Sequence, residues 1–274
     1  MTEQNENPND SHYLANDEEV PAVFFDVKLN AWALPLGLTI TFLLQKFWVF
    51  HHIFTLFASI PCHEMGHASA AWFFGRFALP IGAIVPTAGM TIIGGEHHYW
   101  VNFLYFSFFA ALGYFGYRAE KYFIVTASAV FIFLSLYFMK TFSESEAGPI
   151  ISAAGVAGEF LIASFLIISF YNPLFKKMRW DFFRYPFLVI GCASLTNALT
   201  MWLRIQKHLQ SLPFGTAISA DGSGDTNGDM NRLIQAGWTE EHIIQKYLVM
   251  AKIAVTLILL QYLYSLYLSM SKKD

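Results

Sequence analysis

A histidine pair one helical turn apart is the part of the sequence best suited to chemistry. His63 and His67 enclose Glu64 in the segment His63-Glu64-Met65-Gly66-His67. Helical residues four apart share a face, so the two imidazoles can bind one tetrahedral zinc ion. Glu64 flanks that face, where its carboxylate can serve as general base toward water. Because a catalytic zinc has three protein ligands and one open position, the pattern also requires a third ligand from elsewhere.

The residues on both sides of this motif are apolar, from Phe54 to Pro61 and from Ala68 to Phe74. On a charged, soluble helix the same pattern can arise by chance, with its side chains merely solvated. Ionisable side chains inside an apolar segment are costly and usually functional. Two interpretations follow: a zinc metallopeptidase, or a membrane metal-binding or transport protein that uses the same His and Asp residues. Glu64 separates them, since transport tolerates its loss and hydrolysis does not.

An Asp/Gly-rich segment, residues 220–231, is the most polar part of the chain outside the N-terminal tail. It offers Asp221, Asp225 and Asp229 as carboxylate ligands. The residues after Asp229 have a short helical pattern that ends at Gly237, so we expect Asp229 at the N-terminus of a helix, on a rigid element. Asp229 is therefore the predicted third ligand, with Asp225 as the alternative.

Two other interpretations of this segment stay open. It has the composition of an ordinary connector, and its alternating acidic residues are compatible with calcium binding. The EF-hand pattern fails, because the sixth position counted from Asp221 is Thr226 and the twelfth is Arg232.

Two more polar residues interrupt apolar segments. Glu159 is either a hydrogen-bond partner for a zinc-binding histidine or a buried, neutral acid, and the nearby Gly155 and Gly158 permit close helix approach. Asn197 could bind a substrate backbone, although a bridge between two helices is the favoured role.

Two histidine pairs, His51–His52 and His97–His98, raise the alternative of a histidine-rich di-iron hydroxylase or desaturase. Such sites need many histidines at short, repeated spacing. Adjacent residues on a helix point in different directions, and no HxxHH follows the first motif. We interpret these pairs as side chains at the membrane interface.

The HEMGH segment in an apolar helix, followed much later by an Asp/Gly-rich segment near another apolar run, resembles the site-2 protease family of membrane-embedded zinc metallopeptidases. The resemblance implies two zinc-binding histidines at His63 and His67, a catalytic Glu64, and an aspartate ligand at Asp229 or Asp225. About 25 residues carry the resemblance. The second motif departs from the family pattern, because the Asn-Pro-rich lead into Leu-Asp-Gly is absent, which indicates a divergent branch.

Composition indicates that these residues sit in a membrane protein. Hydrophobic residues make up 55% of the 274 residues and charged residues 14%, against roughly 25% charged in soluble domains. Mean hydropathy is +0.42. The net charge of −3 does not suggest nucleic acid as a partner, and the two cysteines imply no disulfide framework.

Long apolar segments predict an all-α, multi-pass integral membrane protein, because a helix needs roughly 20 apolar residues to cross the bilayer. The apolar residues from Ala31 to Gly75 are interrupted by Gln45–Lys46 and by Pro61. They form either two spans in a tight hairpin, which is favoured, or one long helix followed by a separate helix that starts at Pro61. Two spans here make seven in total, with six as the alternative. The other expected spans are Trp100–Tyr117, Tyr122–Met139, Pro149–Tyr171, Tyr185–Leu203 and Leu248–Met270.

The predicted organisation is a disordered acidic tail, residues 1–30, followed by one transmembrane metallopeptidase domain, residues 31–274. Residues 206–247 are expected to be a polar loop that carries the aspartate ligand. Residues 80–96 are apolar but too rich in Gly and Pro to span, so we expect a re-entrant or edge-strand loop. The expected partners are the lipid bilayer and a membrane protein or membrane-proximal peptide as substrate. The sequence indicates neither the oligomeric state nor which membrane is the host.

Overall fold

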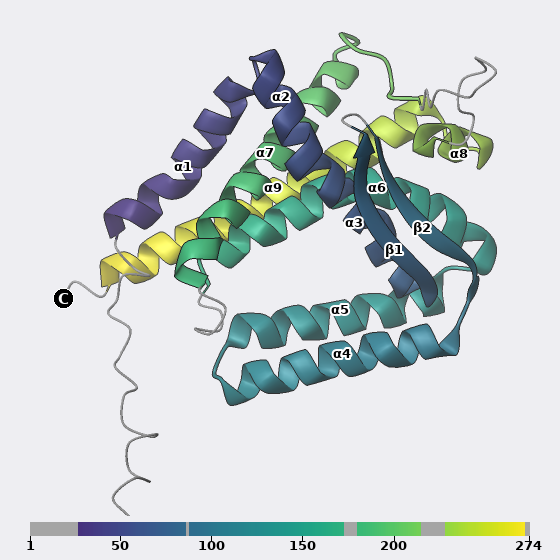
Figure 1. Cartoon of the computed structure of the whole chain (residues 1–274), viewed down its shortest axis with the longest axis horizontal. Coiled ribbons are helices and arrows are strands. Elements are labelled where there is room, and N and C mark those ends of the chain that lie inside the picture. The colour runs from purple at the N-terminus through teal and green to yellow at the C-terminus, as the bar shows by residue number, and fades with distance from the viewer. Residues whose placement is uncertain (1–26, 86–87, 173–179, 215–227, 272–274) are drawn as a thin grey trace, which may run out of the picture.

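The computed structural model describes residues 27–85, 88–172, 180–214 and 228–271, and most of them are helical (Figure 1). In chain order the elements are α1 Val27–Leu44, α2 Trp48–Phe54, the π-helix η2 Thr55–Ser59, α3 Ile60–Phe73, β1 Arg76–Val85, β2 Ala88–His97, α4 Tyr99–Arg118, α5 Tyr122–Thr141, α6 Glu144–Phe170, α7 Trp180–Gln206, α8 Asp229–Gln235 and α9 Glu240–Ser271. Of the predicted tail, residues 27–30 belong to α1 and the rest lies outside the described residues.

The all-α prediction holds for the main architecture, and one β-hairpin departs from it. Within the described residues, four helices are long and apolar enough to cross a membrane, which indicates a membrane protein: α5, α6, the part of α7 at Phe182–Gln206 and the part of α9 at Glu240–Leu268. The predicted six or seven spans are not confirmed. The apolar part of α1 is shorter, at Ala31–Leu44, and the Tyr, Trp and Asn residues of α4 lower its hydropathy.

The predicted break near Gln45 is present between α1 and α2. Gln45 is the first residue after α1. Its side-chain amide donates to the carbonyl of Ala193 at 2.8 Å and to the hydroxyl of Thr196 at 3.2 Å. These bonds to α7 satisfy a polar side chain that would otherwise face an apolar environment. Further along, Pro61 lies in the first turn of α3 and has no N–H to donate, and the turn before it is wound as η2.

α3 packs closely against α6 because glycines face each other across the contact. A Cβ added to Gly66 would lie 2.1 Å from the carbonyl oxygen of Ala154 and 2.8 Å from the Cα of Gly158. A Cβ on Gly158 would lie 2.5 Å from the carbonyl oxygen of Cys62. Side chains at either position would force the helices apart, so the small residues allow the backbones to approach. This contact brings the histidines of α3 against the face of α6 that carries Glu159.

α6, α7 and α9 form the main core. Fully buried side chains from these helices meet there, including Phe160 of α6, Trp202 of α7 and Tyr247 of α9, and α8 adds Met230 and Leu233 to the same cluster. In Figure 1 α6 and α9 run side by side, and α8 lies near the start of α9. The short helix is thus attached to the core by its apolar residues, while its first residue faces α3.

The hairpin of β1 and β2 packs on α3. The two strands are antiparallel, with Thr91 opposite Pro80 and three irregularities in the register. Both strands are edges, in agreement with the expected edge-strand loop. An ion pair between Arg76 of β1 and Glu144 of α6 links the start of the hairpin to the neighbouring helix.

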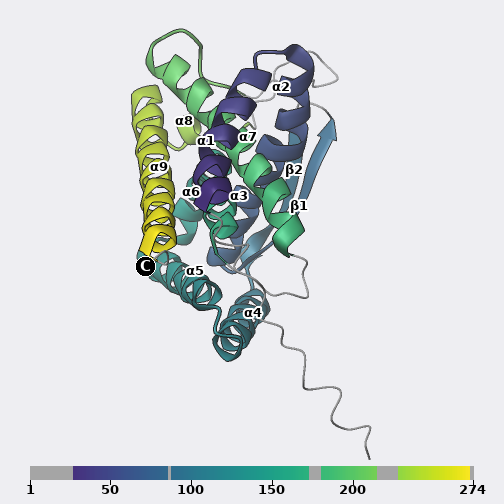
Figure 2. The same cartoon turned by 90° about the vertical axis from the view of Figure 1, so that its left-hand side faces the viewer.

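α4 and α5 form an antiparallel pair beyond the hairpin. Figure 2 shows the pair at one end of the molecule, away from α1 and α7. Ring contacts join the pair to α3, as between Phe73 and Tyr105, whose centroids are 6.1 Å apart. The pair therefore packs against the far end of the helix that carries the histidine motif.

Candidate metal centre

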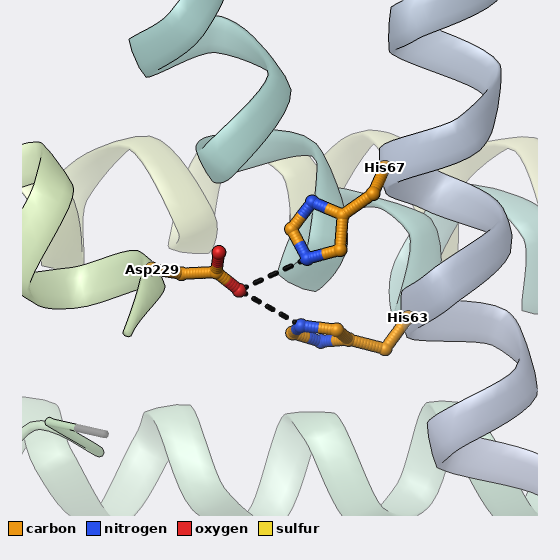
Figure 3. Close-up of side chains that lie close together, drawn as sticks. All are labelled: His63, His67 and Asp229. Carbon is orange, nitrogen blue, oxygen red and sulfur yellow. Dashed lines mark hydrogen bonds and ion pairs between the residues drawn. The ribbon is translucent and has the colours of Figure 1, made fainter. Parts of the chain in front are cut away.

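Three side chains from two distant parts of the chain meet at one point. Oδ2 of Asp229 lies 3.0 Å from Nε2 of His63 and 3.0 Å from Nε2 of His67, as Figure 3 shows. One ligand atom from each residue lies within 4.8 Å of the others, and this is the one group of three or more His, Cys, Asp or Glu in the described residues that could hold a metal ion. The structure thus brings together the three residues that the sequence analysis put forward as ligands.

The outer nitrogens of both imidazoles are held by α6. Nδ1 of His67 donates to the carbonyl oxygen of Ile151 at 2.7 Å, and Nδ1 of His63 lies 2.9 Å from Oε1 of Glu159. A carbonyl oxygen only accepts hydrogen bonds, so Nδ1 of His67 carries the hydrogen. In the neutral imidazole Nε2 is then the acceptor and available to a metal. Glu159 is 6% exposed and touches a candidate ligand, as expected for the first of its two predicted roles.

This arrangement needs positive charge at its centre, either from protons on the imidazoles or from a metal ion. With Nδ1 protonated, two Nε2 lone pairs and a carboxylate oxygen face one another, and these groups repel unless protons or a metal ion lie between them. Donors bound at 2.0–2.1 Å to a tetrahedral zinc ion lie about 3.3 Å apart. The two separations of 3.0 Å between His63 or His67 and Asp229 are close to that value. The residues present therefore fit a metal ion with two nitrogen ligands and one oxygen ligand.

Gly155 of α6 leaves the space that such an ion would need. A Cβ at this position would lie 2.4 Å from Nε2 of His63 and 2.5 Å from Nε2 of His67. From the sequence, Gly155 is expected only to permit close helix packing. In the structure Gly155 has a second role, because any side chain at this position would fill the space beside the Nε2 atoms of His63 and His67.

Asp229 is held in place by the short helix that it begins. α8 starts at Asp229, as predicted, and ends before Gly237, which has a φ of +87° that suits glycine. Met230 and Leu233 anchor the helix in the core. Partial burial raises the pKa of Asp229, but when Nε2 of His63 and His67 carries a proton, the hydrogen bonds that it donates to the carboxylate outweigh this effect and hold the pKa well below its usual range. Asp229 is therefore an anion at neutral pH.

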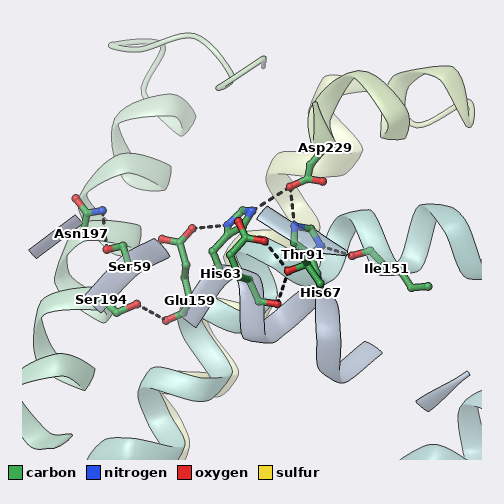
Figure 4. A network of polar contacts seen from close by, with 10 residues as sticks. Ser59, His63, His67, Thr91, Ile151, Glu159, Ser194, Asn197 and Asp229 are labelled. Atoms are coloured by element: carbon green, nitrogen blue, oxygen red, sulfur yellow. Dashed lines mark hydrogen bonds and ion pairs between the residues drawn. The ribbon is translucent and has the colours of Figure 1, made fainter. Parts of the chain in front are cut away.

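Glu64 faces the hairpin. Its side chain is buried, and the hydroxyl of Thr91 on β2 donates to Oε2 at 2.6 Å and lies 3.0 Å from the Glu64 carbonyl oxygen. Figure 4 shows Thr91 close to His63 and His67. On the same strand, a Cβ at Gly89 would lie 2.4 Å from Oε1 of Glu64. The residue next to the candidate ligand His63 is thus a buried carboxylate with a fixed orientation.

The remaining predicted site residues lie elsewhere or outside the described part of the chain. Asn197 donates to the hydroxyl of Ser59 at 3.0 Å and so bridges α7 and η2, which is the structural role that was favoured. Asp221 and Asp225 lie outside the described residues. The pairs at 51–52 and 97–98 form no three-residue metal group within the described residues, so the site shows no histidine-rich cluster of the di-iron kind.

Sequence reasoning missed Thr91, Gly89 and the Ile151 carbonyl. Thr91 sits in a short apolar strand, and its pairing with Glu64 depends on how the hairpin lies on α3. A backbone carbonyl carries no residue signal at all.

In comparisons with protein-family models, with curated proteins and with solved structures, no match to the chain was found.

Proposed function

We propose that this protein is a membrane-embedded zinc metallopeptidase that cleaves membrane proteins or membrane-proximal peptides. One observation carries the proposal: a carboxylate oxygen of Asp229 lies 3.0 Å from the Nε2 atoms of both His63 and His67. Two nitrogens and one carboxylate oxygen are a ligand set typical of catalytic zinc, with one position left open. Glu64, the neighbour of one ligand in the chain, is the general base.

The roles of the side chains follow from this geometry. His63, His67 and Asp229 would hold zinc, which when bound polarises the scissile carbonyl and makes water more acidic. Glu64 takes a proton from the attacking water and later delivers it to the leaving amine. Glu159 and the Ile151 carbonyl orient the two imidazoles through their Nδ1 atoms.

The same residues support placing the chain as a divergent member of the site-2 protease family. HEMGH lies on a helix within an apolar region, and the aspartate lies on a short helix before the last apolar helix. In this proposal α1, the α2–η2–α3 unit and α4 also lie in the membrane, which makes the protein multi-pass with six or seven spans. A site built on such helices is reached by substrates in or near the bilayer.

The test is cleavage of a panel of co-reconstituted membrane substrates by wild-type protein and by Glu64→Gln. Glutamine has nearly the same shape but cannot take up the proton, so we expect retained zinc and a loss of activity of roughly 10²–10⁴-fold. Glu120→Gln, at the exposed turn between α4 and α5, is the matched control and should behave like wild type. Equal activity of Glu64→Gln and wild type would rule out Glu64 as the base. No cleavage by wild type, together with zinc flux into vesicles, would favour the transporter instead.

A further inference from the structure

The orientation of Glu64 is determined by a strand that lies outside the metal centre. The hydroxyl of Thr91 reaches two acceptors on Glu64, Oε2 at 2.6 Å and the main-chain oxygen at 3.0 Å. The shorter contact is to the charged oxygen, where a hydrogen bond is strongest. No other side-chain hydrogen bond to the Glu64 carboxylate is found within the described part of the structure. Thr91 is thus the principal restraint on this side chain.

The second carboxylate oxygen is positioned by the same strand. Gly89 has no side chain, and an added Cβ would lie 2.4 Å from Oε1 and 2.7 Å from Cγ of Glu64. Oε1 therefore occupies space that any other residue at position 89 would fill. One face of β2 thus positions both carboxylate oxygens of Glu64. Thr91 binds Oε2 through its hydroxyl, and Gly89, which has no Cβ, leaves the space that Oε1 occupies.

The alternation of β2 separates this inner face from the outer one. Met90 and Ile92 are 42% and 45% exposed, whereas Gly89 and Thr91 lie against α3. Side chains alternate along a strand, so a shift of one residue in register would replace the hydroxyl by an isoleucine or methionine side chain. The position of the hydroxyl thus depends on the register of the hairpin.

We propose that Thr91 is a positioning residue for the general base Glu64, and that the β1–β2 hairpin thereby sets the orientation of the base relative to the metal centre. The inference rests on the proposed role of Glu64. The Thr91 hydroxyl donates a hydrogen bond to Oε2 of Glu64 and so restrains the torsions of the Glu64 side chain. Oε1 is then the oxygen left to accept the proton from water. A serine can supply the same bond. A valine, although nearly the same shape, cannot.

The experiment compares Thr91→Val, Thr91→Ser and Gly89→Ala in the full-length, zinc-loaded protein. We expect Thr91→Val to lower kcat by up to about 100-fold, which is what a misplacement of about 1 Å can cost. KM, zinc content and thermal stability should stay close to wild type. Thr91→Ser should restore most of kcat, and Gly89→Ala should lower it by displacing the carboxylate from the other side. Thr41→Val in α1 is the matched control, because it removes a buried hydroxyl that contacts the carbonyl oxygens of Gly37 and Leu38 and the hydroxyl of Thr196 and has no hydrogen bond to Glu64.

A structure of Thr91→Val adds a measurement that does not depend on cleavage. The Glu64 carboxylate should leave its wild-type position, while His63, His67 and Asp229 keep theirs. An unchanged carboxylate, or an unchanged kcat in an active protein, would overturn the positioning role and leave the peptidase proposal intact. If the wild type cleaves no substrate, the proposed function fails, and the position of the carboxylate in the variant still decides whether Thr91 holds it.

Discussion

Oδ2 of Asp229 lies 3.0 Å from Nε2 of His67, although 162 residues separate them in the chain. The same oxygen lies 3.0 Å from Nε2 of His63. Asp229 reaches this point because α8 is anchored in the core of α6, α7 and α9, and the histidines reach it because glycines let α3 approach α6.

Asp229→Ala should lower zinc affinity by more than about 100-fold, because losing even an outer partner of a ligand commonly costs 10–100-fold. Asp225→Ala is the matched control and should retain about one zinc per chain. Zinc content of purified protein by elemental analysis, with competition against a chelating dye, measures both. Loss of zinc in Asp225→Ala and retention in Asp229→Ala would show that Asp225 is the third ligand, and the proposed mechanism would be unchanged.

Gly155→Ala should lower zinc affinity by at least about tenfold, because about 1.4 kcal/mol of displacement strain corresponds to that factor. The added methyl group would lie within 2.5 Å of the Nε2 atoms of both His63 and His67. Gly148→Ala, on the same helix with no atom within 4 Å of the added Cβ, should bind zinc like wild type. Zinc titration of the two variants side by side is the measurement, and equal affinities would show that Gly155 does not border the ion.

Glu159→Ala should weaken zinc binding by about 10–100-fold, since it removes the partner of Nδ1 of His63. Glu159→Gln should lose less, because its amide oxygen can still accept the hydrogen bond but carries no charge. If zinc affinity falls in the order wild type, Glu159→Gln, Glu159→Ala, Glu159 acts through its hydrogen bond with His63 and not only through packing. An alanine variant that binds zinc as well as wild type would leave Glu159 as a buried acid without influence on the site.

Leu233→Ala should loosen α8 and with it the ligand at its first residue. Leu233 is fully buried, and removing such a side chain commonly costs about 2–5 kcal/mol. We expect weaker zinc binding and a lower melting temperature. High zinc should partly restore the melting temperature, since an ion that binds only the folded form stabilises it. Ile234→Ala, one residue along and 38% exposed, is the control. Weaker zinc binding in the control than in Leu233→Ala would contradict the anchoring role of Leu233.

The chemistry of the first motif and the general character of the fold were predictable from the sequence. A spacing of four residues puts His63 and His67 on one helical face whatever surrounds them, and long apolar runs in a chain with few charges predict membrane helices. The short pattern ending at Gly237 was enough to predict that Asp229 begins a helix. These features depend on the spacing of residue types over a few positions, because local backbone geometry decides which side chains share a face.

What the tertiary structure alone decided is which groups meet across long distances in the chain. The pairing of Glu159 with His63 rather than with another polar group, the Ile151 carbonyl on His67, and the hydroxyl of Thr91 on Glu64 depend on the depth and rotation at which α3 packs on α6 and on the register of the hairpin. A shift of one residue would turn the side chains of Glu159 and Thr91 to another face of their helix or strand. Packing of glycines and buried side chains selects among such arrangements, and a pattern within one segment carries no information about them.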